Sequence, residues 1–282
     1  MAKRTAHPWI ESPVTRVHKL SRGANGRPTE DWREDWVATE APLEVRIGGK
    51  PATVLMRTPG HDEELVRGFL FSEGVIASPD DILSIGAPRL AADESGSVIE
   101  VELASSKKAR TVDRLFYSNS SCGVCGKKTI ASLEVRGRIA PDGPRVRRSI
   151  LGTLPDRLRS AQPAFAQTGG VHASALFTPD GELIAVREDV GRHNALDKLI
   201  GWALAARESR LPESVLLVSG RVSYELVQKA VAASIPFIAA VGAPSSLAVE
   251  LAERFRLTLV GFLRASSMNV YAHPERIVGE EL

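Results

Sequence analysis

The chain has 282 residues, of which 43% are hydrophobic and 25% are charged, as in a soluble globular protein of one large or two smaller domains. The formal net charge is +2, but residues 1–30 carry a net of +4, so the remaining chain carries −2. This distribution argues against a nucleic-acid binder, which would show a clustered basic face. No apolar run could span a membrane, no signal-peptide core opens the chain, and two cysteines are too few for a disulfide scaffold; we therefore expect a cytoplasmic protein.

The first part of the chain predicts a basic tail, disordered over residues 1–31, and then a small α+β domain over residues 32–117. Alternating apolar residues on both sides of a Gly-Gly turn are typical of a β-hairpin, and acidic residues after Thr-Pro-Gly are typical of a helix start. The expected elements are the hairpin, the helix and two further strands, over residues 43–57, 58–70, 98–103 and 111–117.

A mobile loop and a basic linker are expected over residues 118–150, followed by an α/β domain over residues 151–282. This domain should begin with a hairpin over residues 173–186 and a helix over 193–206. Three continuous apolar segments, separated by amphipathic segments, then predict a parallel sheet covered by helices on both faces. The expected strands are 215–219, 237–241 and 257–262, and the expected intervening helices are 223–234 and 247–255.

Small and hydroxyl residues follow these strands, together with two arginines. In open α/β sheets, ligands bind beyond the carboxyl ends of the strands, where helix N-termini offer free N–H groups to anions. Turn and cap chemistry explains such residues equally well in any single loop. Their repetition at one edge favours a ligand that carries phosphate, and the absence of Walker A and G-x-G-x-x-G patterns excludes a standard ATP or NAD site. The candidate residues are Ser219, Arg221, Ser245 and Arg264.

The only cysteines, Cys122 and Cys125, form a C-x-x-C within SNSSCGVCGK. A structural zinc site needs about four ligands, and no H-x(3–5)-H spacing supplies the other two. One H-x-E begins at His61, but Ser121 stands where the zinc deaminases have proline before the first cysteine. The polar, glycine-flanked setting is unlike a buried core pair.

Two lysines, Lys127 and Lys128, follow the C-x-x-C and favour a thiolate over a thiol. A mobile, activated thiolate suits covalent carriage of a group between partners. A strand before the cysteines and a helix after them would equally suit a thioredoxin-like dithiol. From these residues alone, zinc half-site, redox dithiol, sulfur carrier and structural pair all stay open.

The chain resembles the FdhD family of formate dehydrogenase accessory sulfurtransferases from about residue 42 to residue 277. One departure is Ala265, which stands where many relatives have glycine after the arginine of Gly-Phe-Leu-Arg. The blocks that carry the resemblance are residues 57–65, 68–74, 121–127, 168–172, 187–198, 219–226 and 243–247.

The resemblance implies a sulfur carrier. Cys122 would accept persulfide sulfur from a cysteine desulfurase, with Cys125 as an assisting thiol, and would pass it to Mo-bis(molybdopterin guanine dinucleotide) bound for formate dehydrogenase. It also implies a homodimer that binds guanine nucleotides such as GDP, and a C-terminal domain similar to cytidine deaminases but without zinc. The segment matched to cofactor binding is Phe262, Leu263, Arg264, Ala265, Ser266 and Ser267.

Two histidines, His172 and His193, are expected to line the cofactor cavity beside the strand-end loops. Each of them could equally have a structural role. Two other functions stay open: a cofactor-binding chaperone that moves no sulfur, and a zinc-dependent nucleoside deaminase relative.

Overall fold

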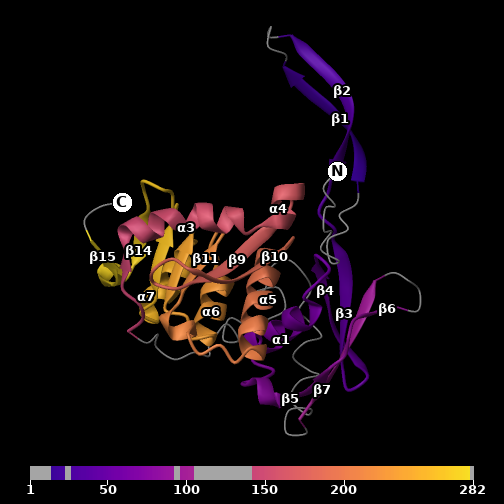
Figure 1. Cartoon of the computed structure of the whole chain (residues 1–282). Helices are drawn as coiled ribbons and strands as arrows, with labels where there is room; N and C mark the ends of the chain where they lie inside the picture. The colour runs from indigo at the N-terminus through magenta and orange to yellow at the C-terminus, as the bar shows by residue number, and fades with distance from the viewer. Residues whose placement is uncertain (1–13, 23–26, 92–95, 105–141, 280–282) are drawn as a thin grey trace.

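The computed structural model describes residues 14–22, 27–91, 96–104 and 142–279. Cys122 and Cys125 lie outside the described residues, as does the strand expected over residues 111–117. Figure 1 shows a large domain built on one sheet, a smaller unit packed beside it, and a two-stranded arm that projects away from both.

The large domain contains a six-stranded sheet with the order β10-β9-β11-β12-β13-β14. The three expected apolar strands are confirmed, and β11, β12 and β13 pair in parallel. The sheet as a whole is mixed, because β9 pairs antiparallel with both β10 and β11, and β14 pairs antiparallel with β13. The strands are β9 His172–Phe177, β10 Leu183–Asp189, β11 Val215–Val218, β12 Phe237–Ala240, β13 Thr258–Gly261 and β14 Asn269–Ala272.

The central strands are apolar throughout because helices cover both faces of the sheet. Leu216 and Ile238 belong to the core beneath α5 Arg192–Ala205, α6 Tyr224–Ala232 and α7 Ser246–Arg254. Their neighbours Leu217 and Phe237 face the opposite core, which is formed with α3 Arg148–Ser160. Alternate residues of one strand point to opposite faces, so a sheet covered on both sides needs apolar residues at every position.

The predicted boundary of this domain at residue 151 is wrong. The chain joins it earlier, because β8 Val146–Arg147 pairs with β15 Ile277–Val278 and α3 begins at Arg148. Basic residues on the exposed side of this segment suggested a linker, but Val146 is fully buried. The remaining short helices of the described chain are α4 Pro163–Thr168, η1 Pro79–Asp81, η3 Leu211–Glu213 and η4 Pro274–Arg276.

The smaller unit is a sheet with one helix, and its predicted hairpin and helix are confirmed. Its strands run in the order β4-β3-β7-β5, and β6 also pairs with β7. The helix α1 packs on this sheet with one side and on α5 with another (Figure 1). The elements are β3 Ala41–Ile47, β4 Lys50–Arg57, α1 Asp62–Ser72, β5 Ile82–Ile85, β6 Arg89–Leu90 and β7 Ser97–Leu103.

The helices α1 and α5 approach each other closely at Gly68 and Gly201. A Cβ atom at Gly68 would lie 1.8 Å from the Asp197 carbonyl oxygen, and one at Gly201 would lie 1.8 Å from the Glu64 carbonyl oxygen. Only glycine lets the two backbones approach this closely. The contact therefore fixes the smaller unit directly against the large domain.

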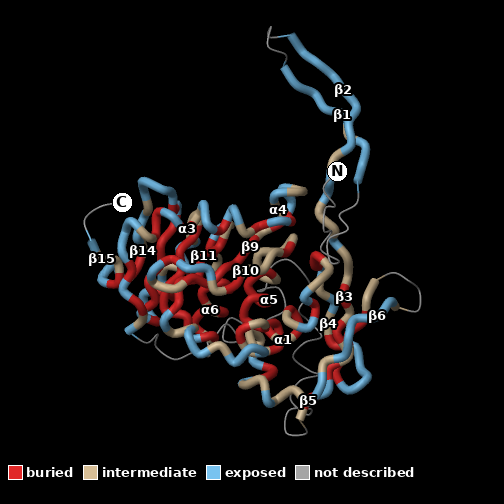
Figure 2. The backbone as a smooth tube through the Cα atoms, viewed as in Figure 1, coloured by how far each residue is buried: buried red, intermediate tan, exposed pale blue. Residues whose placement is uncertain are grey.

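The prediction of a disordered tail through residue 31 is wrong for residues 14–22 and 28–31. They belong to an antiparallel hairpin of β1 Val14–Arg22 and β2 Pro28–Trp36, in which Val14 lies opposite Trp36. The many charges suggested disorder, but they alternate with apolar and β-branched residues in the period-2 pattern of a strand. Figure 2 shows that the arm is exposed along its length.

Candidate functional site

The carboxyl ends of the three parallel strands meet at one edge of the large sheet. Antiparallel β9 begins at this edge, because Ser174 lies opposite Val218, and β10 ends there, because Asp189 lies opposite His172. The N-termini of α5 and α6 follow directly after β10 and β11. Loop backbones are tied together here, as Gly242 N donates to Gly220 O at 3.1 Å and Phe262 N donates to Gly242 O at 3.0 Å. The prediction that these loops share one edge is confirmed.

His172 lies against Gly220 and close to Arg192 at this edge. A Cβ atom at Gly220 would lie 3.2 Å from Nδ1 of His172 and 4.0 Å from Cδ of Arg192, so this glycine makes room for both side chains. Burial lowers the pKa of His172, and the Arg192 charge lowers it further, against a smaller opposing effect of Asp189. At neutral pH His172 is therefore an uncharged imidazole beside a guanidinium.

His193 occupies the first turn of α5. Its Nε2 lies 3.1 Å from the Ser223 hydroxyl, at the N-cap of α6, and 3.8 Å from a Glu225 carboxylate oxygen. Burial lowers the pKa of His193 to about 4, and the charges of Lys229 and Arg192 act in the same direction. A neutral His193 therefore links the first turns of α5 and α6.

A cavity of about 490 Å³ opens from this edge and extends beneath the end of α3 and the start of α4. Its walls combine apolar side chains, two glycines and several polar groups. Among the predicted site residues it contains Ser219 and His172. The lining residues are Pro155, Asp156, Leu158, Arg159, Gln162, Phe165, Gly169, Gly170, Val171, His172, Ser219 and Val241.

The wall formed by α3 and α4 carries groups suited to a planar polar ligand. The Arg159 guanidinium lies 4.1 Å from the centre of the Phe165 ring. Gln162 is 4% exposed, and its Nε2 makes no hydrogen bond of ordinary geometry to a described residue. Burial raises the pKa of the neighbouring Glu188, against hydrogen bonds from the Phe165 and Ala164 amides and the nearby Gln162 amide. Buried donors without partners are rare, so Gln162 Nε2 marks a place where a ligand or water can accept.

The other predicted contacts have visible structural roles or lie at the rim. Ser245 is the N-cap of α7, and its hydroxyl accepts from Ala248 N at 3.3 Å. Ser219 accepts from Ala173 N at 2.9 Å, which holds the start of β9. Arg221 is exposed in the loop before α6. These observations agree with turn and cap chemistry and leave binding roles for the three residues as a prediction.

The segment matched to cofactor binding, residues 262–267, follows β13 at the same edge. Phe262 has a φ of 51° and is 44% exposed, whereas Leu263 is fully buried in the core and cannot touch a ligand. Arg264 donates to the Val241 carbonyl at 2.8 Å, which places its guanidinium at the rim of the cavity. Ala265, Ser266 and Ser267 are exposed.

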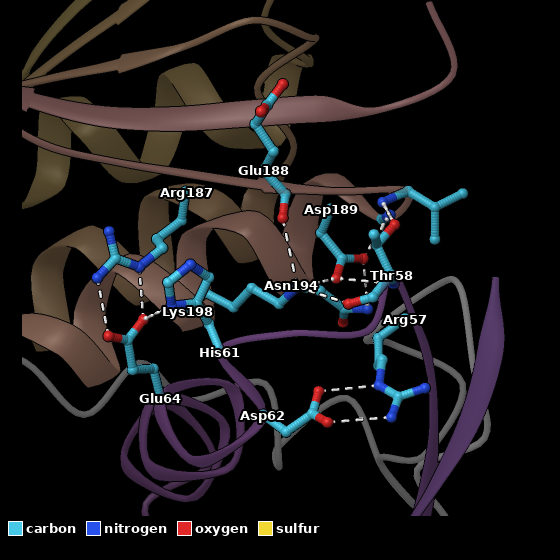
Figure 3. A network of polar contacts seen from close by, with 12 residues as sticks. Arg57, Thr58, His61, Asp62, Glu64, Arg187, Glu188, Asp189, Asn194 and Lys198 are labelled. Atoms are coloured by element: carbon cyan, nitrogen blue, oxygen red, sulfur yellow. Dashed lines mark hydrogen bonds and ion pairs between the residues drawn. The ribbon is translucent and has the colours of Figure 1, made fainter. Parts of the chain in front are cut away.

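The N-terminus of α5 is held from behind by a buried polar network, which Figure 3 shows. Asp189 is fully buried, forms an ion pair with Lys198 at 2.8 Å, and accepts from Gly191 N at 2.8 Å and from Asn194 Nδ2 at 3.0 Å. It also accepts from Thr58 N of the smaller unit at 3.1 Å. One carboxylate therefore joins both units and sets the position of the first turn of α5.

A second pair of contacts crosses the same junction. Arg187 Nη2 donates to Glu64 at 2.8 Å, and this interaction together with His61 lowers the pKa of Glu64 to about 2 although burial alone would raise it. Arg57 forms a buried two-bond pair with Asp62, at 2.9 and 3.0 Å (Figure 3). Most polar side chains of the 57–65 and 187–198 blocks thus dock the two units on each other.

The arrangement can bind an anion beside a planar group. The N-termini of α5 and α6 offer backbone N–H groups, and Arg192, whose Nε is buried without a hydrogen-bond partner among the described residues, adds a charge. Within residues 14–22, 27–91, 96–104 and 142–279, no group of three or more His, Cys, Asp or Glu side chains could hold a metal ion. No helix in the described part of the chain is long and apolar enough to cross a membrane.

Sequence reasoning missed Arg192 and the α3–α4 wall of the cavity. Arg192 stands directly before His193 at the helix start, where a cation is unusual and could have been noticed. The wall belongs to α3, whose apolar residues Leu151, Leu154 and Leu158 recur at helical spacing, although Pro155 interrupts the pattern. Gln162 itself carried no signal in the sequence.

The fold and the site define an α/β protein with a ligand cavity at the carboxyl edge of its central sheet. The model of the FdhD/NarQ family matches residues 38–278, and the chain belongs to this family. It is 52% identical over 255 residues to a protein of Mycobacterium tuberculosis named sulfur carrier protein FdhD, covering 87% of this chain and 92% of the relative. A protein of Streptomyces coelicolor with the same name is 50% identical over 272 residues, covering 94% of this chain and 96% of the relative.

The fold is also similar to that of a solved protein. A crystal structure from Desulfotalea psychrophila, described as a candidate formate dehydrogenase accessory protein, superposes with a TM-score of 0.71 at 26% identity. The similarity covers 94% of this chain and 99% of the other. The mixed α/β class is thereby confirmed, and the cytidine deaminase-like assignment of the large domain stays a prediction.

Proposed function

We propose that this protein is a sulfurtransferase that carries sulfur as a persulfide on Cys122. It accepts the sulfur from a cysteine desulfurase and delivers it to Mo-bis(molybdopterin guanine dinucleotide), which formate dehydrogenase then receives. The names of relatives about 50% identical support the carrier role. The single observation that carries the acceptor half of the proposal is the cavity of about 490 Å³ at the strand ends.

The loading step uses the chemistry of thiol–disulfide exchange. The Cys122 thiolate attacks the terminal sulfur of the desulfurase persulfide, and the S–S bond of that persulfide breaks as the desulfurase cysteine leaves as a thiolate. Cys122 then carries one additional sulfur, and no net oxidation occurs. Lys127 and Lys128 favour the attacking thiolate, and Cys125 acts as the assisting thiol.

The acceptor binds at the sheet edge as a substrate. The phosphates of its guanosine diphosphate ends lie at the N-termini of α5 and α6, where Arg192 supplies charge, and the rim residues Arg221 and Arg264 extend this positive surface. A planar ring enters between α3 and α4, where the Phe165 ring and the Gln162 amide can contact its face and its edge. GDP is the small analogue that tests this arrangement.

The neutral state of the two histidines suits this assignment. His172 and His193 have lowered pKa values because they are buried, so neither adds charge at neutral pH. Each can donate or accept a hydrogen bond near the phosphates without the strong binding that a second cation would cause. A carrier must release its acceptor to formate dehydrogenase, so moderate affinity serves the transfer. The protein acts in the cytoplasm as a homodimer.

Intact-mass analysis tests the carrier role. The full-length protein is incubated with a cysteine desulfurase and cysteine, and we expect an adduct of one sulfur atom that is lost on reduction. Cys122→Ala should lack the adduct, whereas Cys125→Ala should retain it. An adduct that persists in Cys122→Ala would overturn the assignment. Undiminished maturation of formate dehydrogenase by the Cys122→Ser/Cys125→Ser variant would instead identify a cofactor chaperone.

Calorimetric titration with GDP tests the acceptor site. Gln162→Ala should weaken binding about tenfold, since it removes a buried donor to the ligand. Thr153→Ala is a matched control, because Thr153 is an exposed residue of α3 that does not line the cavity. Equal affinity of Gln162→Ala and the unmodified protein would remove the α3–α4 wall from the site.

A further inference from the structure

The projecting arm has one apolar face and one polar face. Residues opposite each other in an antiparallel pair point to the same side, so the register places Val14, Leu20, Trp32 and Trp36 together on one face. These four side chains are 45%, 68%, 56% and 41% exposed. The arm thus exposes its large apolar side chains on a single side.

The other face has the composition of a solvated surface. It carries the cross-strand pairs of Thr15 with Asp35, Lys19 with Asp31, and Ser21 with Thr29. An isolated two-stranded hairpin is at best marginally stable in water, and a third layer on an apolar face is the usual remedy. The distribution of residues indicates that the apolar face is covered when the protein is assembled.

The apolar face is also organised locally for a flat contact. The His18 and Trp32 rings stack with their centres 4.7 Å apart, and the Arg16 guanidinium lies 5.0 Å from the Trp32 ring centre. These contacts hold long side chains in defined positions before any partner arrives. Aromatic anchors and arginine are the residue types that contribute most to protein–protein binding.

The charges on this face are divided between the two strands. Arg16 and Arg22 lie on β1, whereas Glu30 and Glu34 lie on β2. Two copies can stack these faces about a two-fold axis in two ways. An axis perpendicular to the strands places β1 over β1 and sets like charges together. An axis parallel to the strands places β1 over β2 of the second copy and sets opposite charges together.

We propose that the arm is a dimerisation element that packs its apolar face on the same face of a second copy, about an axis parallel to the strands. Because Arg16 and Glu34 are opposite each other in the register, Arg16 of one copy lies over Glu34 of the other. His18 lies over Trp32 of the second copy in the same way. The arm lies outside residues 38–278 that match the family model, so this contact goes beyond the shared fold.

The size of the face sets the expected strength. Nine residues per strand give an arm about 30 Å long and about 10 Å wide. This is well below the area of a standard protein–protein interface, so we expect dissociation in the micromolar range if the arms alone hold the copies together. Sedimentation equilibrium of the full-length protein over micromolar loadings measures this constant.

Charge reversal tests the orientation. Arg16→Glu and Glu34→Arg each place like charges opposite one another in a homodimer, and each should raise the dissociation constant about tenfold or more. A mixture of the two variants restores both contacts. In the mixed dimer the two substituted side chains lie over each other as one pair of opposite charges, and the unsubstituted Arg16 lies over the unsubstituted Glu34 as the other. We expect the mixed sample to recover dimers near the wild-type constant, which separates a repelled interface from an arm that has unfolded.

The matched control lies on the opposite face. Lys19→Glu also reverses one member of a cross-strand pair, that with Asp31, and it should leave the dissociation constant unchanged. A monomeric wild type would overturn the proposal, as would insensitivity to Arg16→Glu, an equal effect of Lys19→Glu, or a mixture that fails to recover. The readout is mass alone, so it is independent of sulfur transfer.

Discussion

The ion pair between Lys198 and Asp189 allows the junction of the two units to be tested quantitatively. The side chains are 1% and 0% exposed, their charged atoms lie 2.8 Å apart, and Lys198 also donates to the Thr58 carbonyl at 2.8 Å. Lys198→Met keeps the length of the side chain but leaves the buried Asp189 carboxylate without its cation. Removing one partner of a buried pair costs about 3–5 kcal/mol, and we expect a loss of this size in the free energy of unfolding, measured with urea.

The control for this substitution crosses the same junction at the surface. Arg207 lies 2.6 Å from Asp80, but both side chains are 70% exposed, so Arg207→Met should cost less than about 1 kcal/mol. The double variant Lys198→Met/Asp189→Asn removes the orphaned charge and should cost less than the sum of the two single variants. A loss below about 1 kcal/mol for Lys198→Met, or strict additivity in the double variant, would refute the reasoning.

Three further predictions concern the helix contact, the histidine and the cap. Gly201→Ala places a Cβ atom 1.8 Å from the Glu64 carbonyl oxygen, so the helices must separate; we expect at least about 2 kcal/mol of destabilisation in thermal unfolding, and an unchanged Tm would contradict it. The folded pKa of His193 is lowered to about 4 from 6.5, so the unfolded chain gains its proton first and stability falls by up to about 3 kcal/mol as pH drops from 6.5 to 4. His193→Gln should lack this component in urea unfolding followed against pH. Ser245→Ala removes the α7 cap to Ala248 and should cost about 1 kcal/mol, whereas Ser245→Asp should keep stability and weaken GDP binding by repulsion if the residue faces phosphate.

Local patterns predicted the elements that pack by a regular period. The segments 215–218, 237–240 and 258–261 are apolar throughout because both sheet faces are covered, and this signal is visible in the sequence. The position of β9 between β10 and β11 has no such signal, because strand order depends on contacts between residues far apart in the chain. The arm was missed because charge density outweighed a real two-residue alternation.

The site was predictable where motifs end strands and unpredictable where helices supply the wall. Ser219 and His172 follow or begin strands at one edge, and the structure brings both to the cavity. Gln162 and Phe165 reach the same cavity from the opposite layer, which only tertiary packing determines. Leu263 shows the reverse error, since a matched block contained a core residue as well as exposed ones.

The Asp189 carboxylate has a mechanical consequence for a protein that hands its substrate to others. It binds Thr58 of the smaller unit on one side and the backbone of Gly191, at the start of α5, on the other. A force that pulls the smaller unit away from α5 therefore reaches the turn that carries Arg192 and His193 before it reaches the sheet. A protein that grips the smaller unit would thus act as a lever on the phosphate end of the cavity, and docking on one side of the molecule would loosen the hold on the other.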